Sequence, residues 1–314
     1  LTTLGYVFTP EEVKTVLGEE NGEEFCRLYD ITDSGNFEGK SIPNRIYSLE
    51  NGWDMNDPRL EKLYDYRINR TKLHKDDKIL LSWNAWAMIA LAKAGQVLEE
   101  PSYLDAAIHI HDFIECKMVT GNDRLYLRYR DGEAAYAGQL EDYAVYALAL
   151  LELYRVTFDA KFLKAAIHRA QQMVELFEDN SVAAMVLQTL ASLTGEPEWQ
   201  AAADRQLSFL AGEIGEYPSA SCFGVLAMMD ALYPHRELVC ATSDGLPNEL
   251  KNYLKSHSAD DLQVLLKTKD NAETLAQCAP FTKDYPIPEQ GTMYYLCEGG
   301  ACKAPVSEFS KLKI

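Results

Sequence analysis

A repeat of paired helices is the feature that most constrains how this chain can fold. Three stretches share the same order: a long amphipathic helix, a short turn, an aromatic residue and an alanine-rich second helix. They span residues 82–109, 140–168 and 181–203. Repeats made only of helices build an α-solenoid or a closed α/α toroid. The sequence therefore predicts a mainly α fold made of antiparallel helical hairpins.

The apolar pattern of the second repeat favours helices over strands. Apolar residues from Leu140 to Tyr154 recur at intervals of three and four residues, which places them on one face of a helix. Turn residues separate the two helices of a pair, at Asp159 in the second repeat and at Gly195 in the third. The turns are short, so each pair is predicted to be an antiparallel hairpin.

The three repeats are unevenly spaced. Tyr103 and Phe162 occupy matching positions 59 residues apart, whereas Phe162 and Trp199 are only 37 residues apart. The second interval leaves almost no turn between the helices that meet at residues 177–182. Either this connection is naturally tight or a segment is absent near residues 180–181, and we expect absence. Fewer long helices are visible than a closed ring of six hairpins requires, so we expect an incomplete ring.

The helical pattern stops near residue 234. Short apolar runs at 237–241, 262–266 and 292–297 have strand character, and residues 247–254 suit a helix that begins with a proline. The strand–helix–strand order predicts a small α/β segment with parallel pairing. We therefore expect a helical toroid domain over residues 1–234 and an α/β segment over residues 235–314 packed on it. The first domain opens with shorter helices near residues 11–17, 23–28 and 59–69.

Composition excludes several classes of function. The net charge of −18 disfavours nucleic acid, whose phosphates need a basic face, and also anionic membranes. No run approaches the roughly 18 apolar residues of a membrane helix, and the first residues lack the pattern of a signal peptide. Seven cysteines, mostly scattered, are typical of a reducing compartment. We expect a soluble, cytoplasmic protein without a cofactor, because phosphate-binding glycine loops and nucleophile elbows do not occur.

Polar residues gather where the first helices of the repeats begin. Aligning the repeats places residues 82–84 opposite residues 141–143, and residues 74–78 lead directly into the first of these starts. In a ring of hairpins such starts point to one end and converge on one pocket. Paired carboxylates in a pocket rimmed by aromatic residues suit glycosyl chemistry: one carboxylic acid protonates a leaving oxygen while a second carboxylate activates water.

Asp77 and Asp142 are the candidate catalytic carboxylates of this pocket. The candidate substrate-binding residues are His74, Asp76, Lys78, Trp83, Asn84, Glu141 and Tyr143. The alternative interpretation of Asp142 is a helix N-cap, because acidic residues are favoured at helix starts in any protein. No metal site is expected, since His109 and His168 occupy matching positions on second helices, away from the starts.

Cys297 and Cys302 form a candidate thiol pair near the end of the chain. Four residues separate them, including Gly299-Gly300, instead of the two residues of a thioredoxin-type or zinc-knuckle motif. A small disulfide, a metal site completed by outside ligands, and two free thiols remain as alternatives for this pair.

Several stretches together resemble one protein family, in consistent order over nearly the whole chain. They are Tyr6–Val13, Gly35–Lys40, His74–Asn84, Leu140–Ala144, Leu153–Asp159 and Tyr294–Pro305. The family is the thioredoxin-domain-containing one that includes bacterial YyaL-type proteins and the animal spermatogenesis-associated homologue. The resemblance implies a thioredoxin-like N-terminal domain, which this sequence lacks, and an (α/α)6 toroid similar to six-hairpin glycosidases and N-acylglucosamine 2-epimerases. Of a glycine-rich segment usual in the family only residues 180–184 match, which supports an interruption there and a similar one near residues 4–5.

We therefore expect an incomplete (α/α)6 toroid that binds or processes a sugar or sugar-like metabolite at the starts of its inner helices. A catalytic version would resemble a glycoside hydrolase or an epimerase, although the histidine pair of the epimerases has no counterpart here beyond His74. The rival hypothesis is a non-enzymatic binding or scaffold domain that serves an attached thioredoxin-like module, and Cys297 and Cys302 motivate it. A purely structural domain with a closed funnel is the third alternative, since fold does not fix function.

Overall fold

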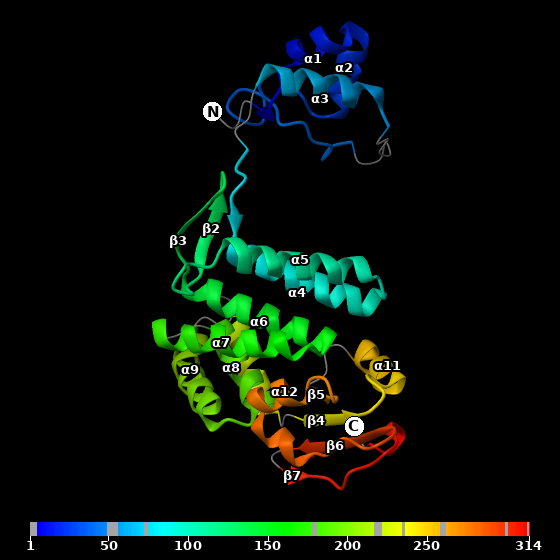
Figure 1. Ribbon diagram of the computed structural model, residues 1–314. Coiled ribbons are helices and arrows are strands. Elements are labelled where there is room, and N and C mark those ends of the chain that lie inside the picture. Colours follow the sequence, from blue (N-terminus) through cyan, green and yellow to red (C-terminus); the bar gives the residue numbers. More distant parts are fainter. Residues whose placement is uncertain are drawn as a thin grey trace. The chain divides into compact units, whose positions relative to one another are not determined.

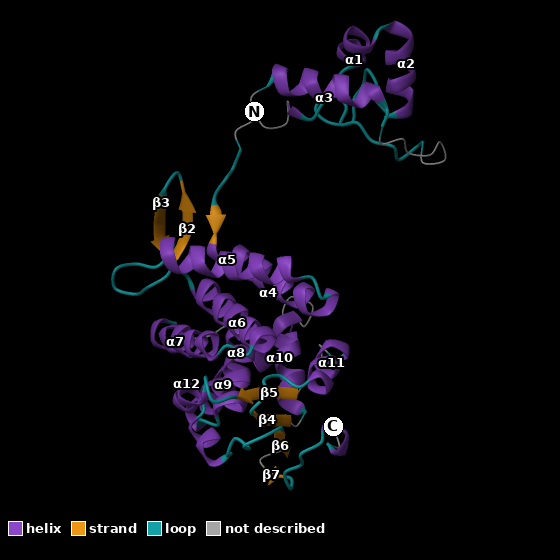
Figure 2. Cartoon of the chain, turned by 45° about the vertical axis from the view of Figure 1, so that its right-hand side comes forward, coloured by secondary structure: helices purple, strands orange, loops and turns teal. Residues whose placement is uncertain are grey.

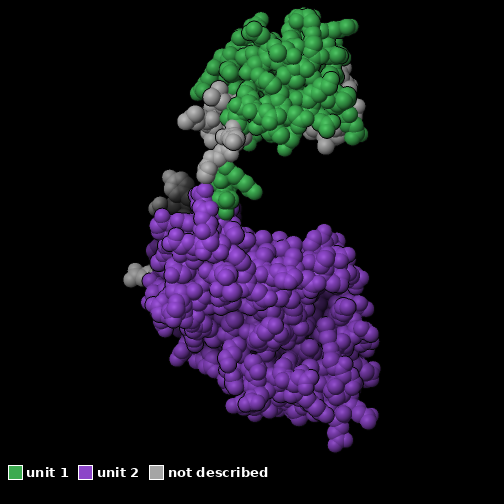
Figure 3. Space-filling view, turned by 45° about the horizontal axis from the view of Figure 1, so that its top comes forward, with its two compact units in different colours: residues 1–77 green, residues 78–314 purple. Residues whose placement is uncertain are grey.

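The chain forms two compact units, Leu1–Asp77 and Lys78–Ile314, coloured separately in Figure 3. The computed structural model describes residues 5–48, 56–71, 75–177, 181–216, 222–233, 236–257, 262–298, 301–312 and 314. The boundary between the units lies at residues 77 and 78. The division expected at residues 234 and 235 stays a prediction, and the segments on its two sides contribute to one hydrophobic core.

Unit 1 is built around α1 (Pro10–Leu17), α2 (Glu19–Leu28) and α3 (Pro58–Arg70), which confirms the three short helices predicted there. Thr9 begins α1 with a capping box: its hydroxyl accepts a hydrogen bond from the Glu12 N–H, and the Glu12 carboxylate accepts one from the Thr9 N–H. Arg70, at the end of α3, donates to the same carboxylate at 2.8 Å. One glutamate therefore joins the two ends of this unit's helical core.

Unit 2 contains the predicted helical hairpins (Figure 1). The pairs are α4 (Leu81–Leu98) with α5 (Pro101–Lys117), α6 (Leu140–Thr157) with α7 (Ala160–Leu176), and α8 (Ser181–Thr194) with α9 (Pro197–Glu216), followed by α10 (Cys222–Leu232). The expectation of a mainly α chain with a small α/β segment at its C-terminal end is confirmed.

The first helices of the hairpins make an inner layer. Helix α6 packs against both α4 and α8, and α8 packs against α10. The rings of Trp86 in α4 and Phe223 in α10 lie 5.1 Å apart, so these four helices follow one another around a common centre. Every residue of α6 from Asp142 to Tyr154 is buried, as expected for a helix with partners on all sides.

A β-hairpin is inserted between α5 and α6. Strands β2 (Tyr126–Arg130) and β3 (Glu133–Ala137) are joined at Asp131-Gly132, both at positive φ, and β2 also pairs with the short strand β1 (Ile79–Leu80). This hairpin lengthens the interval from Tyr103 to Phe162. The difference between 59 and 37 residues therefore does not by itself require a missing segment. The two expected interruptions involve Leu4 and Asn180, which lie outside the described residues.

The second sheet has the strand order β5-β4-β6-β7 (Figure 2). Its strands are β4 (Arg236–Thr242), β5 (Leu262–Lys267), β6 (Thr292–Glu298) and β7 (Ala301–Cys302), with α11 (Asn248–Ser256) and α12 (Ala272–Cys278) as connections. The parallel pairing predicted for the first two strands is confirmed, while β6 is antiparallel to β4 and to β7. The Tyr154 hydroxyl of α6 donates to the Val264 carbonyl of β5, so this sheet packs directly on the inner layer.

Candidate functional site

Asp142 links the starts of two inner helices. Its Oδ1 accepts a hydrogen bond from the Ser82 N–H in α4 at 3.1 Å, and its Oδ2 accepts one from the Gln139 N–H before α6 at 2.8 Å. The side chain is buried, and burial raises the pKa of its carboxyl, although the hydrogen bonds from Gln139 and Ser82 act in the opposite direction. These are the contacts of a capping residue. The N-cap of α6 is Gln139, and Asp142 is the N3 residue of the capping box, so Asp142 is a capping residue although not the N-cap itself. A catalytic role for Asp142 stays a prediction.

The other candidates at the helix starts divide into buried and exposed residues. Tyr143 is 1% exposed, and its hydroxyl accepts a hydrogen bond from the Leu125 N–H, so its ring belongs to the core. Asn84 donates from Nδ2 to the Leu80 carbonyl at 2.8 Å. Trp83 is 71% exposed, and Glu141 is exposed as well. The structure thus brings Ser82 and Asp142 together and leaves Trp83 and Glu141 facing solvent.

The segment that leads into α4 is only partly described. His74 lies outside the described residues. Asp76, Asp77 and Lys78 are exposed. Asp77 ends unit 1, whereas Asp142 belongs to unit 2, so the pairing of these two carboxylates stays a prediction.

A cleft of about 460 Å³ lies at the other end of the inner helices, a volume within the usual range of small-molecule sites. Four inner helices, together with α11 and β5, supply its walls. Polar and charged side chains on these walls are Lys93, Gln96, Glu152, Arg155, Thr189, Asp230, His257 and Gln263. The sequence prediction placed the pocket at the helix starts, whereas this cleft is lined by residues from the middle and later turns of the inner helices.

A buried glutamate between two cations is the most distinctive feature of the cleft. The Glu152 side chain is only 5% exposed; Lys93 Nζ lies 3.2 Å from its Oε1, and an Arg155 guanidinium nitrogen lies 3.4 Å from its Oε2. Arg155 also donates to Gln263 Oε1 at 3.1 Å and to Thr189 Oγ1 at 3.4 Å. A buried carboxylate needs such partners, because an unpaired charge there would be strongly destabilising. The cluster joins α4, α6, α8 and β5 through side chains.

Large apolar side chains also line the cleft. Leu226 and Met229 of α10 and Tyr233, which directly follows this helix, are 50%, 49% and 65% exposed. Such exposure of large apolar side chains at a concave surface is typical of a ligand site. The cleft therefore presents donors and acceptors together with apolar surface.

Sequence reasoning missed this cleft, although a signal for it was present. Glu152 and Arg155 are the charged residues in the otherwise apolar stretch 143–154 and its continuation to Val156. Three residues apart on a helix, they lie on the same face. Charged residues on a helix that is otherwise apolar all round indicate a buried polar function.

Metal and membrane sites find no support within the described ranges. Among those residues, no group of three or more His, Cys, Asp and Glu side chains is arranged to hold a metal ion. No helix in the described part of the chain is both long and apolar enough to cross a membrane.

Cys297 and Cys302 are joined by a disulfide between β6 and β7, which selects one of the three alternatives left open for this pair.

No family model matches the chain. It is 24% identical to human spermatogenesis-associated protein 20 (Homo sapiens) over 98% of its own length, and 29% identical to an uncharacterized protein of Caenorhabditis elegans over 50% of its length. The chain spans about half of the human relative, 48% of that protein's length. That alignment runs over 382 positions, more than the 314 residues of this chain, so the relative contains segments without a counterpart here.

Solved structures of carbohydrate-active enzymes are similar at a coarse level. A cellobiose 2-epimerase from Bacillus thermoamylovorans has a TM-score of 0.43 and 12% identity, with 74% of this chain and 67% of that chain covered. An α-mannanase from Bacteroides thetaiotaomicron has a TM-score of 0.41 and 16% identity, with 67% and 72% covered. In sequence, the chain is similar over nearly all its length to the spermatogenesis-associated protein, whose family its motifs resemble.

Proposed function

We propose that the cleft of unit 2 binds a sugar or sugar-like metabolite. The observation that carries this proposal is the buried Glu152, held between Lys93 and Arg155 in a cleft that is also lined by large apolar side chains. A sugar presents hydroxyl groups that both donate and accept hydrogen bonds, together with C–H faces that pack on apolar and aromatic surfaces. Each kind of surface in the cleft then has a counterpart on the ligand.

The charged residues of the cleft favour a neutral ligand. Lys93 and Arg155 offset the charges of Glu152 and Asp230, so no single sign of charge dominates. Glu152 accepts hydrogen bonds from ligand hydroxyls, while Lys93 and the Gln263 amide donate to ligand oxygens. Glycoside hydrolysis requires a carboxylic acid that donates a proton, and a carboxylate paired with two cations is an acceptor. Binding, with processing left to other groups, is therefore the function that we propose.

A matched pair of aromatic residues tests where the ligand binds. Tyr233 in the cleft is 65% exposed and Trp83 at the inner-helix starts is 71% exposed, so neither substitution by alanine removes a core residue. The full chain and the variants Tyr233→Ala and Trp83→Ala are titrated calorimetrically with glucose, mannose and cellobiose. We expect at least one sugar to bind, and Tyr233→Ala to weaken it about tenfold, the equivalent of about 1.4 kcal/mol. Trp83→Ala should bind it like the unsubstituted chain.

Each other outcome decides against the proposal in a different way. A loss of binding in Trp83→Ala alone would assign the binding site to the starts of the inner helices, where Asp142 and Glu141 lie. Absence of binding to any sugar, with no change of melting temperature, would contradict the sugar hypothesis. It would favour the scaffold hypothesis, in which the domain serves an attached thioredoxin-like module.

A further inference from the structure

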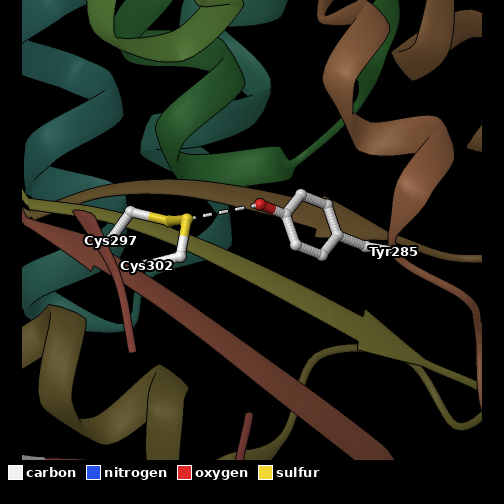
Figure 4. The surroundings of a disulfide bond; sticks show 3 residues. All are labelled: Tyr285, Cys297 and Cys302. Carbon is white, nitrogen blue, oxygen red and sulfur yellow. Dashed lines mark hydrogen bonds between the residues drawn. A yellow bond between two sulfur atoms is a disulfide. The ribbon is translucent and has the colours of Figure 1, made fainter. Parts of the chain in front are cut away.

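The disulfide between Cys297 and Cys302 lies in an exposed strand pair. The two cysteines are directly opposite each other in the β6–β7 ladder (Figure 4). Strand β7 is the last strand of the sheet in the order β5-β4-β6-β7, and both of its residues, Ala301 and Cys302, are exposed. Cys302 Sγ is therefore the sulfur that a thiol from solvent reaches more easily.

The remaining cysteines differ from this pair. Cys26, Cys240 and Cys278 are buried, whereas Cys116 and Cys222 are exposed, and none of these five cysteines forms a disulfide. Burial raises the pKa of the Cys240 thiol to about 12 and that of Cys278 to about 11, so these thiols stay protonated and unreactive at neutral pH. The exposed disulfide therefore differs in reactivity from the buried thiols.

A hydroxyl group is placed beside the exposed sulfur. The Tyr285 Oη lies 3.6 Å from Cys302 Sγ, and because a disulfide sulfur has no hydrogen, the tyrosine is the donor (Figure 4). Tyr285 is held in place at its backbone, where its carbonyl accepts a hydrogen bond from Lys267 Nζ at 2.7 Å, and at its ring, which packs on Tyr295 at 4.5 Å. A donor in this position stabilises negative charge on sulfur.

Charged groups of both signs lie around the pair, including Arg236 of β4, which is opposite Glu298. Lys303 follows Cys302 and forms an ion pair with Glu298 of β6 at 2.9 Å. Across the sheet, Glu237 of β4 is opposite Cys297 and accepts a hydrogen bond from Ser192 Oγ at 2.8 Å. The Tyr285 hydroxyl is thus the polar group that distinguishes the Cys302 sulfur.

We propose that Cys297–Cys302 is a reversible thiol–disulfide exchange site that is reduced by a dithiol. A thiolate of the dithiol attacks Cys302 Sγ, the bond between the two cysteine sulfurs breaks, and Cys297 leaves as a thiolate that takes a proton from water. The second thiolate of the dithiol then attacks its partner sulfur in the mixed disulfide. Cys302 is released as a thiolate beside the Tyr285 hydroxyl. Cys302 then takes a proton from water, so the protein gains two electrons from the dithiol and two protons by way of the solvent, while the dithiol becomes a cyclic disulfide.

Reduction removes the disulfide cross-link that joins β7, and the segment after it, to β6. Residues 301–312 are otherwise held by the Lys303 N–H to the Leu296 carbonyl, by the two backbone hydrogen bonds between Tyr294 and Val306, and by Phe309 packing on Tyr253. Together with the β6–β7 pairing and the Lys303–Glu298 ion pair, these contacts keep the segment in place after reduction, and the disulfide adds a covalent cross-link at its first residues. The exchange site thus controls how firmly the end of the described chain is attached to β6.

Alkylation with mass-spectrometric readout tests the exchange. The full chain, first oxidised with glutathione disulfide, is incubated with dithiothreitol at pH 7, quenched with N-ethylmaleimide and digested. Labelling of Cys297 and Cys302 should rise in proportion to dithiothreitol concentration and should vanish on reoxidation. Cys240 and Cys278 should stay unlabelled, and Cys116 and Cys222 should be labelled throughout. Labelling of the pair in the oxidised protein, or a reduction rate independent of dithiothreitol concentration, would overturn the proposal.

The role of Tyr285 needs its own comparison. In the reduced protein, Tyr285→Phe should lower the alkylation rate of Cys302 about threefold or more, the effect expected from losing one hydrogen bond to the thiolate. The exposed thiol of Cys116 is the internal control and should react at an unchanged rate. Tyr295→Phe, which alters the neighbouring ring, is the matched variant. An equal loss in both variants would show that Tyr285 acts through packing and not through its hydroxyl.

Discussion

Replacing Asp142 should destabilise unit 2 far more than replacing its neighbour Glu141. In Asp142→Ala the Ser82 N–H loses its acceptor in a buried position, and the Gln139 N–H loses its acceptor in a partly buried one. A buried donor left without a partner costs about 1–3 kcal/mol. The loss is partly offset because the variant no longer buries a charge. We expect a decrease of about 3 kcal/mol in the free energy of unfolding, or about 5–10 °C in the melting temperature of a unit this size.

The measurement is urea unfolding of Asp142→Ala, Asp142→Asn and Glu141→Ala at pH 7. Glu141 belongs to the same first turn of α6 but is exposed, so its variant should stay within about 0.5 kcal/mol of the unsubstituted chain. Asp142→Asn keeps one acceptor and should fall between the two alanine variants. Equal stabilities of Asp142→Ala and Glu141→Ala would refute the capping interpretation.

The pH dependence supplies a second check on Asp142. Its folded pKa lies above the ordinary value of 3.8, so between these two values the folded state binds more protons than the unfolded state. Stability contributed by this residue therefore falls as the pH rises from 3.8 through the folded pKa. Asp142→Asn should remove that part of the slope. An unchanged slope in the variant would show that the carboxyl is not desolvated as the structure indicates.

Two further predictions concern other parts of the chain. Lys267 donates from Nζ to the carbonyls of Thr282 and Tyr285, and burial lowers its pKa below 10.5. Between the lowered folded pKa and 10.5 the unfolded state binds more protons, so stability should rise with pH there. Lys267→Met should abolish this rise in urea unfolding at pH 8–10; persistence of the rise would assign it to another group. In unit 1, a Cβ at Gly35 would lie 2.3 Å from the Lys40 carbonyl oxygen, whereas one at Gly39 meets nothing within 4 Å, and both residues have positive φ. Gly35→Ala should therefore cost more than 2 kcal/mol and Gly39→Ala about 1 kcal/mol, measured by amide hydrogen exchange in α1–α3, and equal costs would contradict the clash.

Helical periodicity predicted much of the fold because it reflects burial directly. The hairpins of unit 2, the three short helices of unit 1 and the parallel β4–β5 pair all followed from apolar spacing and turn residues. The β2–β3 hairpin was missed even though Asp131-Gly132, flanked by Tyr126–Arg130, is a strong signal for a two-residue turn. This hairpin accounts for part of the uneven repeat spacing, while the segment expected to be absent near residues 180–181 stays a prediction.

The candidate site was harder to predict because its geometry depends on contacts between distant segments. Ser82 and Asp142 do meet, as alignment of the repeats suggested, but their contact satisfies backbone donors. The cleft depends on Lys93, Glu152 and Gln263, which come from α4, α6 and β5. No repeat alignment relates a helix to a strand 108 residues further on, which is the separation of Arg155 and Gln263. Packing of the sheet on the inner layer creates that proximity.

Helix α6 has a consequence for how the protein is made. Its residues from Asp142 to Tyr154 are buried on all sides, so the helix has no polar face with which to remain in water. During synthesis it emerges after α4 and α5 but before α7 and α8, when only part of its surface has a partner. The central helix of unit 2 is therefore exposed to aggregation in a growing chain. The surface of α6 is fully buried only after the residues that follow it have been synthesised.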